Sequence, residues 1–305
     1  MINIKNISNK INRISYISRS KKISLALKKI LKTQIIGIVD IGAGHRYLPV
    51  LLNFDGISKI AMVDPNKSLN WSAKNFKKII KYPENIYQYN FGISDKTEKK
   101  KYYVAKTLTG STFIDVYKIA KKGKKKLSNE YFGEENSKIQ QVFSFKDFKK
   151  KFFKFNVDIV KIDVEGLEEK IVSSVIKNSN PSLIEVETNL NSEIYPNSFN
   201  KINHLLIKKN YKLVTGFSIF KRTKNKKIQN SQFELGNYDN PILRSSLEQF
   251  ECIYIKDKKK YDLKDIAIFI GYGLLHEVKK IIHQSKIKFS KLTESQVNKI
   301  IKDFF

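Results

Sequence analysis

The middle of the chain alternates short apolar runs with amphipathic stretches. Each run is rich in isoleucine, leucine and valine with few interruptions, which is typical of a strand buried on both faces. Strands that alternate with helices predict a mostly parallel sheet covered by helices on both sides, the doubly wound α/β architecture. The predicted strands lie in the runs IIGIVDIGAG (35–44), KIAMVDPN (59–66), NIYQYNFGIS (85–94), VDIVKIDVEG (157–166) and PSLIEVETN (181–189).

A regular stripe of isoleucines opens the chain. Ile4, Ile7, Ile11 and Ile14 recur at intervals of three and four residues, which places their side chains on one face of a helix. We therefore predict an N-terminal packing helix within residues 1–34. A helix that lies on a membrane surface is the alternative, because lysine and arginine flank the stripe.

The last third of the chain combines two further strands with a helical tail. Runs 211–220 and 250–256 predict a strand pair that closes one edge of the sheet. The apolar run at 266–275 is too short for a membrane span, which needs about 20 residues, and it predicts a buried core helix. Polar segments predict long loops at 118–138 and 221–249. The expected parts are an N-terminal helical extension (1–34), an α/β domain (35–256) and a C-terminal helical appendage (257–305).

Composition narrows the class of protein. A chain of 305 residues with 41% hydrophobic content buries one large core without needing disulfides. The single cysteine, Cys252, has no partner for an intramolecular disulfide and lies in an apolar run, where a thiol behaves as a small apolar side chain. The basic N-terminus lacks the continuous apolar stretch of a secretory signal. We therefore expect a cytoplasmic protein without a membrane span.

The net charge of +29 raises the question of a nucleic-acid partner, since the chain has 58 Lys and Arg residues but only 29 Asp and Glu residues. The lysines occur along almost the whole chain and accompany abundant isoleucine and asparagine. This distribution favours a generally basic, solvated surface over a dedicated nucleic-acid patch. Nucleic acid is therefore the less favoured partner.

A glycine turn follows the first predicted strand. In the run Asp40-Ile41-Gly42-Ala43-Gly44, the glycines allow a ligand to approach the backbone closely. A turn of this kind between a strand and a predicted helix is typical of nucleotide-binding domains. An ordinary turn without a ligand is the alternative.

The acidic residues near this turn favour S-adenosylmethionine over NAD. Asp64 ends the next predicted strand, where its carboxylate can accept protons from both ribose hydroxyls. The third glycine of the dinucleotide motif is replaced by Arg46, and Asp40 would repel a pyrophosphate but attract a cationic group. S-adenosylmethionine carries an ammonium and a sulfonium, so the sequence favours it.

Charged residues interrupt the fourth predicted strand. Lys161, Asp163 and Glu165 alternate with apolar residues and therefore share one face, and Glu185 and Glu187 repeat the pattern in the next strand. Burying such groups is costly unless they pair or border a cleft, and the carboxyl ends of parallel strands build the ligand crevice. We therefore predict an active site there. A structural ion pair with one of the glutamates, which only fixes neighbouring strands, is the alternative for Lys161. A Mg²⁺ or Mn²⁺ site is a further interpretation.

Seven segments, in this order, resemble the motifs of FkbM-type methyltransferases over about residues 35–256. They are VDIGAG, VDPN, NFGISDK, GSTF, SFKDF, VDIVKIDVEGLE and PSLIEVE, of which KIDVEGLE is the most specific. The resemblance implies the class I methyltransferase fold, a Rossmann-like, doubly wound, mostly parallel sheet that ends in one antiparallel strand. The chain departs from the family pattern at Arg46, where glycine is frequent, and in the helical tail.

The resemblance also implies roles for individual residues. The glycine turn would lie against the methionine part of the cofactor, Asp64 would hold the ribose, and Gly92 would border the adenine. Asp163 or Glu165 would orient the acceptor hydroxyl or take its proton. The candidate cofactor-binding residues are Asp40, Gly42, Ala43, Gly44, Asp64 and Gly92, and the candidate catalytic residues are Lys161, Asp163 and Glu165.

The predicted function is S-adenosylmethionine-dependent O-methylation of a small molecule or glycan, at a hydroxyl of a sugar, glycan or related natural product. Two alternatives stay open. The first is RNA methylation, which the net charge motivates. The second is a non-catalytic domain that binds a nucleoside, or a partner protein through the helical tail.

Overall fold

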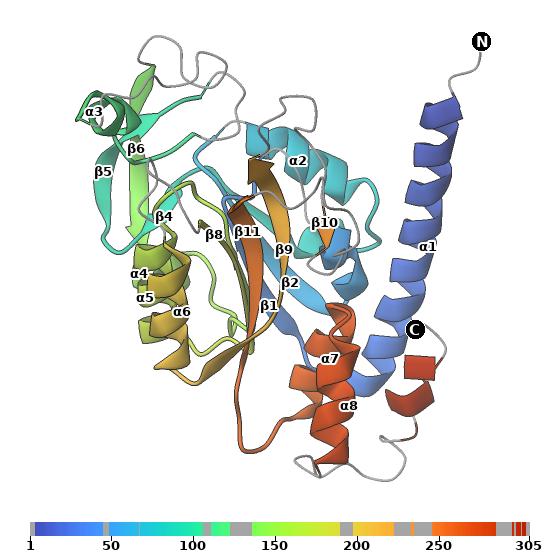
Figure 1. Ribbon diagram of the computed structural model, residues 1–305. Helices are drawn as coiled ribbons and strands as arrows, with labels where there is room; N and C mark the ends of the chain where they lie inside the picture. The colour runs from blue at the N-terminus through green and yellow to red at the C-terminus, as the bar shows by residue number, and fades with distance from the viewer. Residues whose placement is uncertain are drawn as a thin grey trace.

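The computed structural model shows three layers, a central sheet with helices on both sides (Figure 1). The structure describes residues 4–44, 49–66, 68–105, 111–122, 136–189, 198–222, 233–234, 246–284, 295, 297–299 and 301–302.

The central sheet has eight strands in the order β10-β9-β11-β8-β7-β1-β2-β3. Neighbouring strands run parallel from β8 through β7, β1 and β2 to β3, whereas β11 is antiparallel to both β8 and β9. This arrangement confirms the mostly parallel sheet and the strand pair at its edge. The strands are β1 (Ile36–Ile41), β2 (Ser58–Val63), β3 (Ile86–Tyr89), β7 (Ile159–Ile162), β8 (Leu183–Asn189), β9 (Tyr211–Arg222), β10 (Phe233–Glu234) and β11 (Ser246–Lys256).

Alternate residues of each central strand point into different hydrophobic cores. In β1, Ile36 and Ile38 pack with α1 and α7, whereas Val39 and Ile41 pack with α4, α5 and α6. The apolar runs are continuous because both faces of the sheet are covered. The helices on the first face are α1 (Ile4–Leu31), the 3₁₀ helix η1 (Pro49–Phe54), α2 (Ser68–Lys77), α7 (Leu263–Gly271) and α8 (Leu275–His283). Those on the second face are α4 (Phe145–Lys151), α5 (Glu168–Asn178) and α6 (Phe199–Ile207).

The N-terminal and C-terminal helices are built into the first core. Leu27 and Ile30 of α1 are buried in the same cluster as Ile266 and Ile270 of α7. The N-terminal helix and the buried helix predicted around residues 266–275 are therefore confirmed, and Figure 1 shows α1 and α7 close together beside the sheet. The division at residues 34 and 256 stays a prediction.

A second, smaller sheet was not predicted from the sequence. It has the order β4-β6-β5, with β4 (Gly92–Ser94), β5 (Glu98–Tyr103) and β6 (Ser137–Ser144). The single strand predicted over 85–94 is therefore wrong, because β3 ends at Tyr89 and β4 belongs to another sheet. The remaining short helices are η2 (Pro83–Asn85) and α3 (Val116–Lys122).

The two predicted loops are shorter than expected within the described residues. Helix α3 continues to Lys122 and β6 begins at Ser137, so both ends of segment 118–138 are regular, and residues 123–135 lie outside the described residues. Likewise β9 extends to Arg222 and β11 begins at Ser246. Most of the intervening segment, apart from β10, lies outside the described residues.

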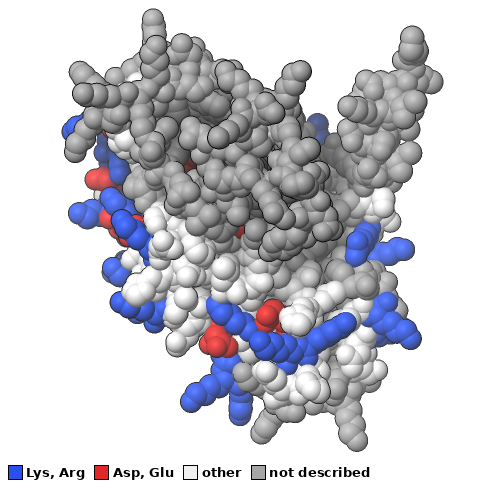
Figure 2. Space-filling view, viewed as in Figure 1, with Lys and Arg blue, Asp and Glu red and all other residues white. Residues whose placement is uncertain are grey.

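Two surface properties bear on partners. No helix in the described part of the chain combines the length and the apolar character that a membrane crossing requires. On the face seen in Figure 2, described lysine and arginine side chains lie at separate places along the left edge, across the bottom and on the right. This view agrees with basicity spread over the surface.

Candidate active site

A buried row of charged side chains crosses three strands. In the strand register, Asp40 of β1 lies beside Lys161 of β7, and Lys161 lies beside Glu185 of β8. Because strand positions alternate, the row shares the face of Ile38 and Ile159, which is the face packed by α1 and α7. All three charged residues are buried. The row therefore continues the first core toward the carboxyl edge of the sheet.

Lys161 is the cation of this row. Its Nζ lies 2.9 Å from Asp163 Oδ2 and 3.8 Å from Asp40 Oδ1. Burial by itself lowers the pKa of Lys161, but the charges of Asp163 and Asp40 outweigh burial, and the pKa lies well above its usual value. Lys161 is therefore charged. The ion pair considered from the sequence is present, with aspartates as partners instead of a glutamate.

The turn after β7 is held from two sides. The Glu168 carboxylate accepts hydrogen bonds from Val164 N at 3.1 Å and from Gly166 N at 2.9 Å. Thr112 Oγ1 donates to the Glu165 carbonyl at 2.6 Å. Glu165 has a φ of 55°, a conformation rare for a residue with a side chain. Such a conformation costs about 1–3 kcal/mol and persists where the surroundings enforce it, often at functional sites.

Three carboxyl groups meet at this turn. Oxygen atoms of Asp163, Glu165 and Glu187 lie within 4.8 Å of one another. Burial and the neighbouring carboxylates raise the pKa of Glu165 to about 8, and they raise that of Glu187 well above its usual value, with a hydrogen bond between Glu187 and Asp163. Both shifts favour the protonated forms of Glu165 and Glu187. The divalent cation considered from the sequence stays a prediction.

The two glycines of the turn after β1 have different surroundings. A Cβ added to Gly42, which has a φ of 82°, would lie 1.6 Å from the carbonyl oxygen of Asp163. Gly42 is therefore required for the packing of this turn against the end of β7. A Cβ added to Gly44 would have no neighbour closer than 3.6 Å. A methyl group at Gly44 would therefore make ordinary van der Waals contact with the turn and with Asp64.

Asp64 lies beside Gly44. Its Oδ2 accepts from Gly44 N at 2.9 Å and its Oδ1 accepts from Asn66 N at 2.6 Å. Burial raises the pKa of Asp64 to about 6, although both hydrogen bonds oppose the shift. Each carboxylate oxygen still has a lone pair for a further donor. The backbone thus holds Asp64 at the edge of the glycine turn.

The acidic row fits a cationic ligand. Both Asp40 oxygens and Oε2 of Glu185 are buried and make no hydrogen bond within the described residues. Burial raises the pKa of Asp40 to about 6 in spite of Lys161. Buried polar atoms are nearly always satisfied, so such atoms at a ligand-binding edge suit a group that brings donors or positive charge. An ammonium or a sulfonium meets this requirement.

Three further residues singled out from the sequence are Ala43, Gly92 and Arg46. Ala43 is buried in the first core. A Cβ on Gly92 would lie 2.6 Å from the ring of Phe113, so this glycine is needed for packing, and its predicted place beside adenine stays a prediction. Arg46 lies outside the described residues. The helix predicted after the glycine turn is the short 3₁₀ helix η1.

The sequence matches the model of a known family. The model describes the methyltransferase FkbM domain and matches residues 40–213, which is more than half of the chain. The chain belongs to the FkbM methyltransferase family. The match includes Asp40 and the glycine turn at one end and the start of β9 at the other.

Solved structures similar to this FkbM chain include three methyltransferases. Precorrin-6y C5,15-methyltransferase from Geobacter metallireducens is 13% identical, with 77% of this chain and 87% of that chain covered and a TM-score of 0.38. Methyltransferase FkbM from Methylobacillus flagellatus is 12% identical, with 72% and 43% covered and a TM-score of 0.38. Magnesium protoporphyrin IX methyltransferase from Synechocystis, with bound SAM, is 8% identical, with 81% and 83% covered and a TM-score of 0.37. A comparison with curated protein sequences finds no match.

Several residues close to the charged row of this FkbM chain were not singled out from the sequence. Glu168 fixes the turn after β7, and its only signal was its place in the KIDVEGLE motif. Glu251 of β11 lies opposite Glu187 in the register, and Tyr272 follows α7. Neither has a local pattern that indicates a site, because both reach the row from segments distant in sequence.

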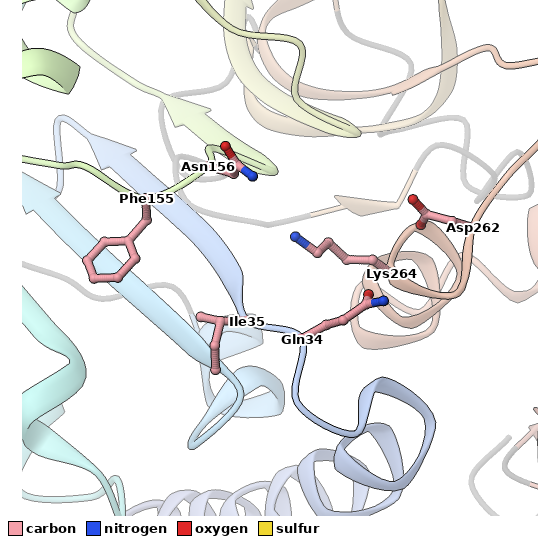
Figure 3. Close-up of a pocket in the computed structure, with 6 residues that line it drawn as sticks. All are labelled: Gln34, Ile35, Phe155, Asn156, Asp262 and Lys264. Atoms are coloured by element: carbon pink, nitrogen blue, oxygen red, sulfur yellow. The ribbon is translucent and has the colours of Figure 1, made fainter.

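A surface hollow of about 470 Å³ lies elsewhere on the FkbM chain (Figure 3). Its lining includes Ile35, just before β1, Asn156, before β7, and Lys264 of α7. These residues precede the amino ends of the strands, whereas Asp64 and Asp163 follow the carboxyl ends. The hollow is therefore separate from the candidate active site.

Proposed function

We propose that this chain transfers the methyl group of S-adenosylmethionine to a hydroxyl of a sugar, glycan or related natural product. The observation that carries the proposal is the buried acidic row beside the glycine turn, in which Asp40 and Glu185 have oxygens that make no hydrogen bond to any residue that the structure describes. A cationic methyl donor complements this row. A pyrophosphate would meet repulsion there.

The residues that would hold the cofactor lie on the first face and at its carboxyl edge. Asp64 would accept the ribose hydroxyls with the lone pairs that Gly44 and Asn66 leave free. Gly44 lies beside it without a side chain, and an added Cβ would lie 3.9 Å from Asp64 Oδ2. Asp40 and Asp163 provide negative charge toward the ammonium and the sulfonium. The cofactor supplies an electrophilic methyl group on a positively charged sulfur.

The acceptor hydroxyl must lose a proton during the transfer. Lys161 holds Asp163 in its charged form, so Asp163 can orient the hydroxyl and accept its hydrogen bond. Glu165, with a pKa of about 8, takes a proton once a cation has favoured its ionised form. Positioning the two reactants would provide several kcal/mol, and a general base contributes about 10²–10⁴ in rate.

The test compares two aspartates that flank the same strand. Asp163→Asn keeps the size of the side chain but removes its charge, and we expect turnover to fall by about 10²-fold while S-adenosylmethionine binding changes by less than about tenfold. Asp158→Asn is the control, because Asp158 pairs with Lys264 at 3.1 Å at the opposite end of β7. Turnover is measured by transfer of a labelled methyl group to a panel of sugars and glycans. Unchanged turnover in Asp163→Asn contradicts the assignment.

The cytoplasmic location predicted from cysteine usage also stays a proposal. Cys252 is free and buried in β11, and burial raises the pKa of its thiol to about 12. A thiol in that state is unreactive. Cys252 therefore has a packing role.

A further inference from the structure

Helix α7 packs on the face of the sheet that carries the buried row, and close contacts fix the end of the helix. Asn53 Nδ2 of η1 donates to the Gly271 carbonyl at 2.7 Å. A Cβ on Gly271 would lie 2.3 Å from the ring of Phe54, so only glycine allows this approach. Tyr272 follows, with its ring 6.0 Å from that of Phe54. The position of Tyr272 is therefore determined by the core.

The Tyr272 hydroxyl faces the charged row from the side of α7. The charged groups around it are Glu185 from β8, Asp40 from β1 and Glu251 from β11, with Glu185 the foremost. The hydroxyl is buried and makes no hydrogen bond within the described residues, and the same holds for Glu185 Oε2. Phenylalanine would fill the same volume without the cost of burying an unsatisfied hydroxyl. A role of the hydroxyl in the row explains why a tyrosine is present.

We propose that Tyr272 is a positioning residue of the methyl-donor site, whose hydroxyl is the donor available to Glu185. This inference rests on the proposed function. It assigns part of the site to the helical tail, which lies beyond residues 40–213, the region that matches the family. The tail would then be required for cofactor recognition as well as for the core.

The effect reaches the methyl donor through Lys161. Burial raises the pKa of Glu185 to about 8, and the Tyr272 hydroxyl counters that rise. Once ionised, Glu185 competes with Asp163 for the positive charge of Lys161, since Glu185 is its neighbour in the register and Asp163 its closest partner. The hydroxyl therefore favours the ionised form of Glu185. More of the charge of Lys161 is then balanced by Glu185, and Asp163 keeps more negative charge for a sulfonium. Without the hydroxyl, Lys161 neutralises Asp163 more completely.

The experiment measures calorimetric affinities for S-adenosylmethionine and for S-adenosylhomocysteine, whose sulfur is neutral. In Tyr272→Phe we expect the affinity for S-adenosylmethionine to fall about tenfold, with less than about a twofold change for S-adenosylhomocysteine. The ligand-free variant should unfold at about the same denaturant concentration as the wild type, because the hydroxyl makes no hydrogen bond within the described residues. Glu185→Gln, which cannot take the ionised form, should show the same selective loss.

Tyr261→Phe is the matched control from the same segment. The Tyr261 hydroxyl donates to Asp257 Oδ1 at 3.1 Å and accepts from Lys258 N at 3.3 Å, away from the row. This variant should be less stable but should bind both ligands as the wild type does. This inference alone is overturned if the wild type binds both ligands but Tyr272→Phe and Glu185→Gln lose affinity equally for both ligands, or lose none. Wild-type protein that binds neither ligand overturns the proposed function, and this inference with it.

Discussion

Replacing Gly42 by alanine should disrupt both the fold and the site. The new Cβ would lie 1.6 Å from the Asp163 carbonyl oxygen and 2.6 Å from the carbonyl carbon, so the backbone of one turn must move. The φ of 82° adds a conformational cost of about 1–2 kcal/mol for a residue with a side chain, and overpacking adds about 1–3 kcal/mol. We expect a loss of about 2–5 kcal/mol in the free energy of unfolding.

Gly44→Ala separates the fold from the ligand. Gly44 also has a positive φ, of 45°, but an added Cβ would have no neighbour closer than 3.6 Å. The free energy of unfolding of Gly44→Ala should therefore fall only by the conformational cost of about 1–2 kcal/mol, because no steric clash adds to it. The new methyl group would lie 3.9 Å from Asp64 Oδ2, where the ribose is expected, so affinity for S-adenosylmethionine should fall more than about tenfold.

Urea denaturation and calorimetry on the two variants distinguish these effects. Denaturation gives the free energy of unfolding of each variant, and calorimetry gives the affinity of each for S-adenosylmethionine. A Gly42→Ala protein as stable as the wild type would refute the account of the contact between the two turns. A Gly44→Ala protein with wild-type affinity would refute the placement of the ribose.

Further predictions concern pH and the turn after β7. Affinity for S-adenosylmethionine, measured by calorimetry, should rise from about pH 5 to about pH 9. The reason is that a cationic ligand favours the ionised forms of three acidic groups. Burial raises the pKa values of Asp40 and Asp64 to about 6 and that of Glu165 to about 8. These pKa values exceed those of the unfolded chain, so the native state binds more protons than the unfolded state. Without ligand, the free energy of unfolding measured by urea titration should therefore fall between about pH 4 and pH 8. A rise over this range would contradict the prediction. Glu168→Gln should lower the free energy of unfolding by about 1–3 kcal/mol in the same assay, because the turn loses an acceptor oxygen. The control Glu169→Gln, at a partly exposed side chain, should lower it by less than about 0.5 kcal/mol. Equal losses in the two variants would contradict the role of Glu168.

The central strands were predictable because burial on both faces leaves a clear pattern. Every residue of Ile36–Ile41 is buried, which is why the run is almost wholly apolar. The small sheet left no such pattern. Strand β5 has the sequence EKKKYY, in which the lysines are exposed or half-buried and only Tyr102 and Tyr103 are buried. A strand with so few buried positions cannot be distinguished from a polar loop by its pattern alone.

The candidate site was predictable where it follows from strand ends. Asp64 and Asp163 were found because the carboxyl ends of parallel strands meet at one edge. Gly42 was assigned to the ligand, yet its nearest neighbour is the Asp163 backbone, which depends on how two turns pack. Tyr272 was missed because the segment 266–275 shows only apolar character. Contacts between distant segments leave no local pattern to detect.

The most direct test of the central claim is calorimetry of the wild-type chain with S-adenosylmethionine and with NAD. The acidic row around Asp40 and the position of Asp64 beside Gly44 predict binding of S-adenosylmethionine with one ligand per chain, and no measurable binding of NAD. Binding of NAD in preference to S-adenosylmethionine, or of neither, would contradict the claim that this row surrounds a cationic methyl donor.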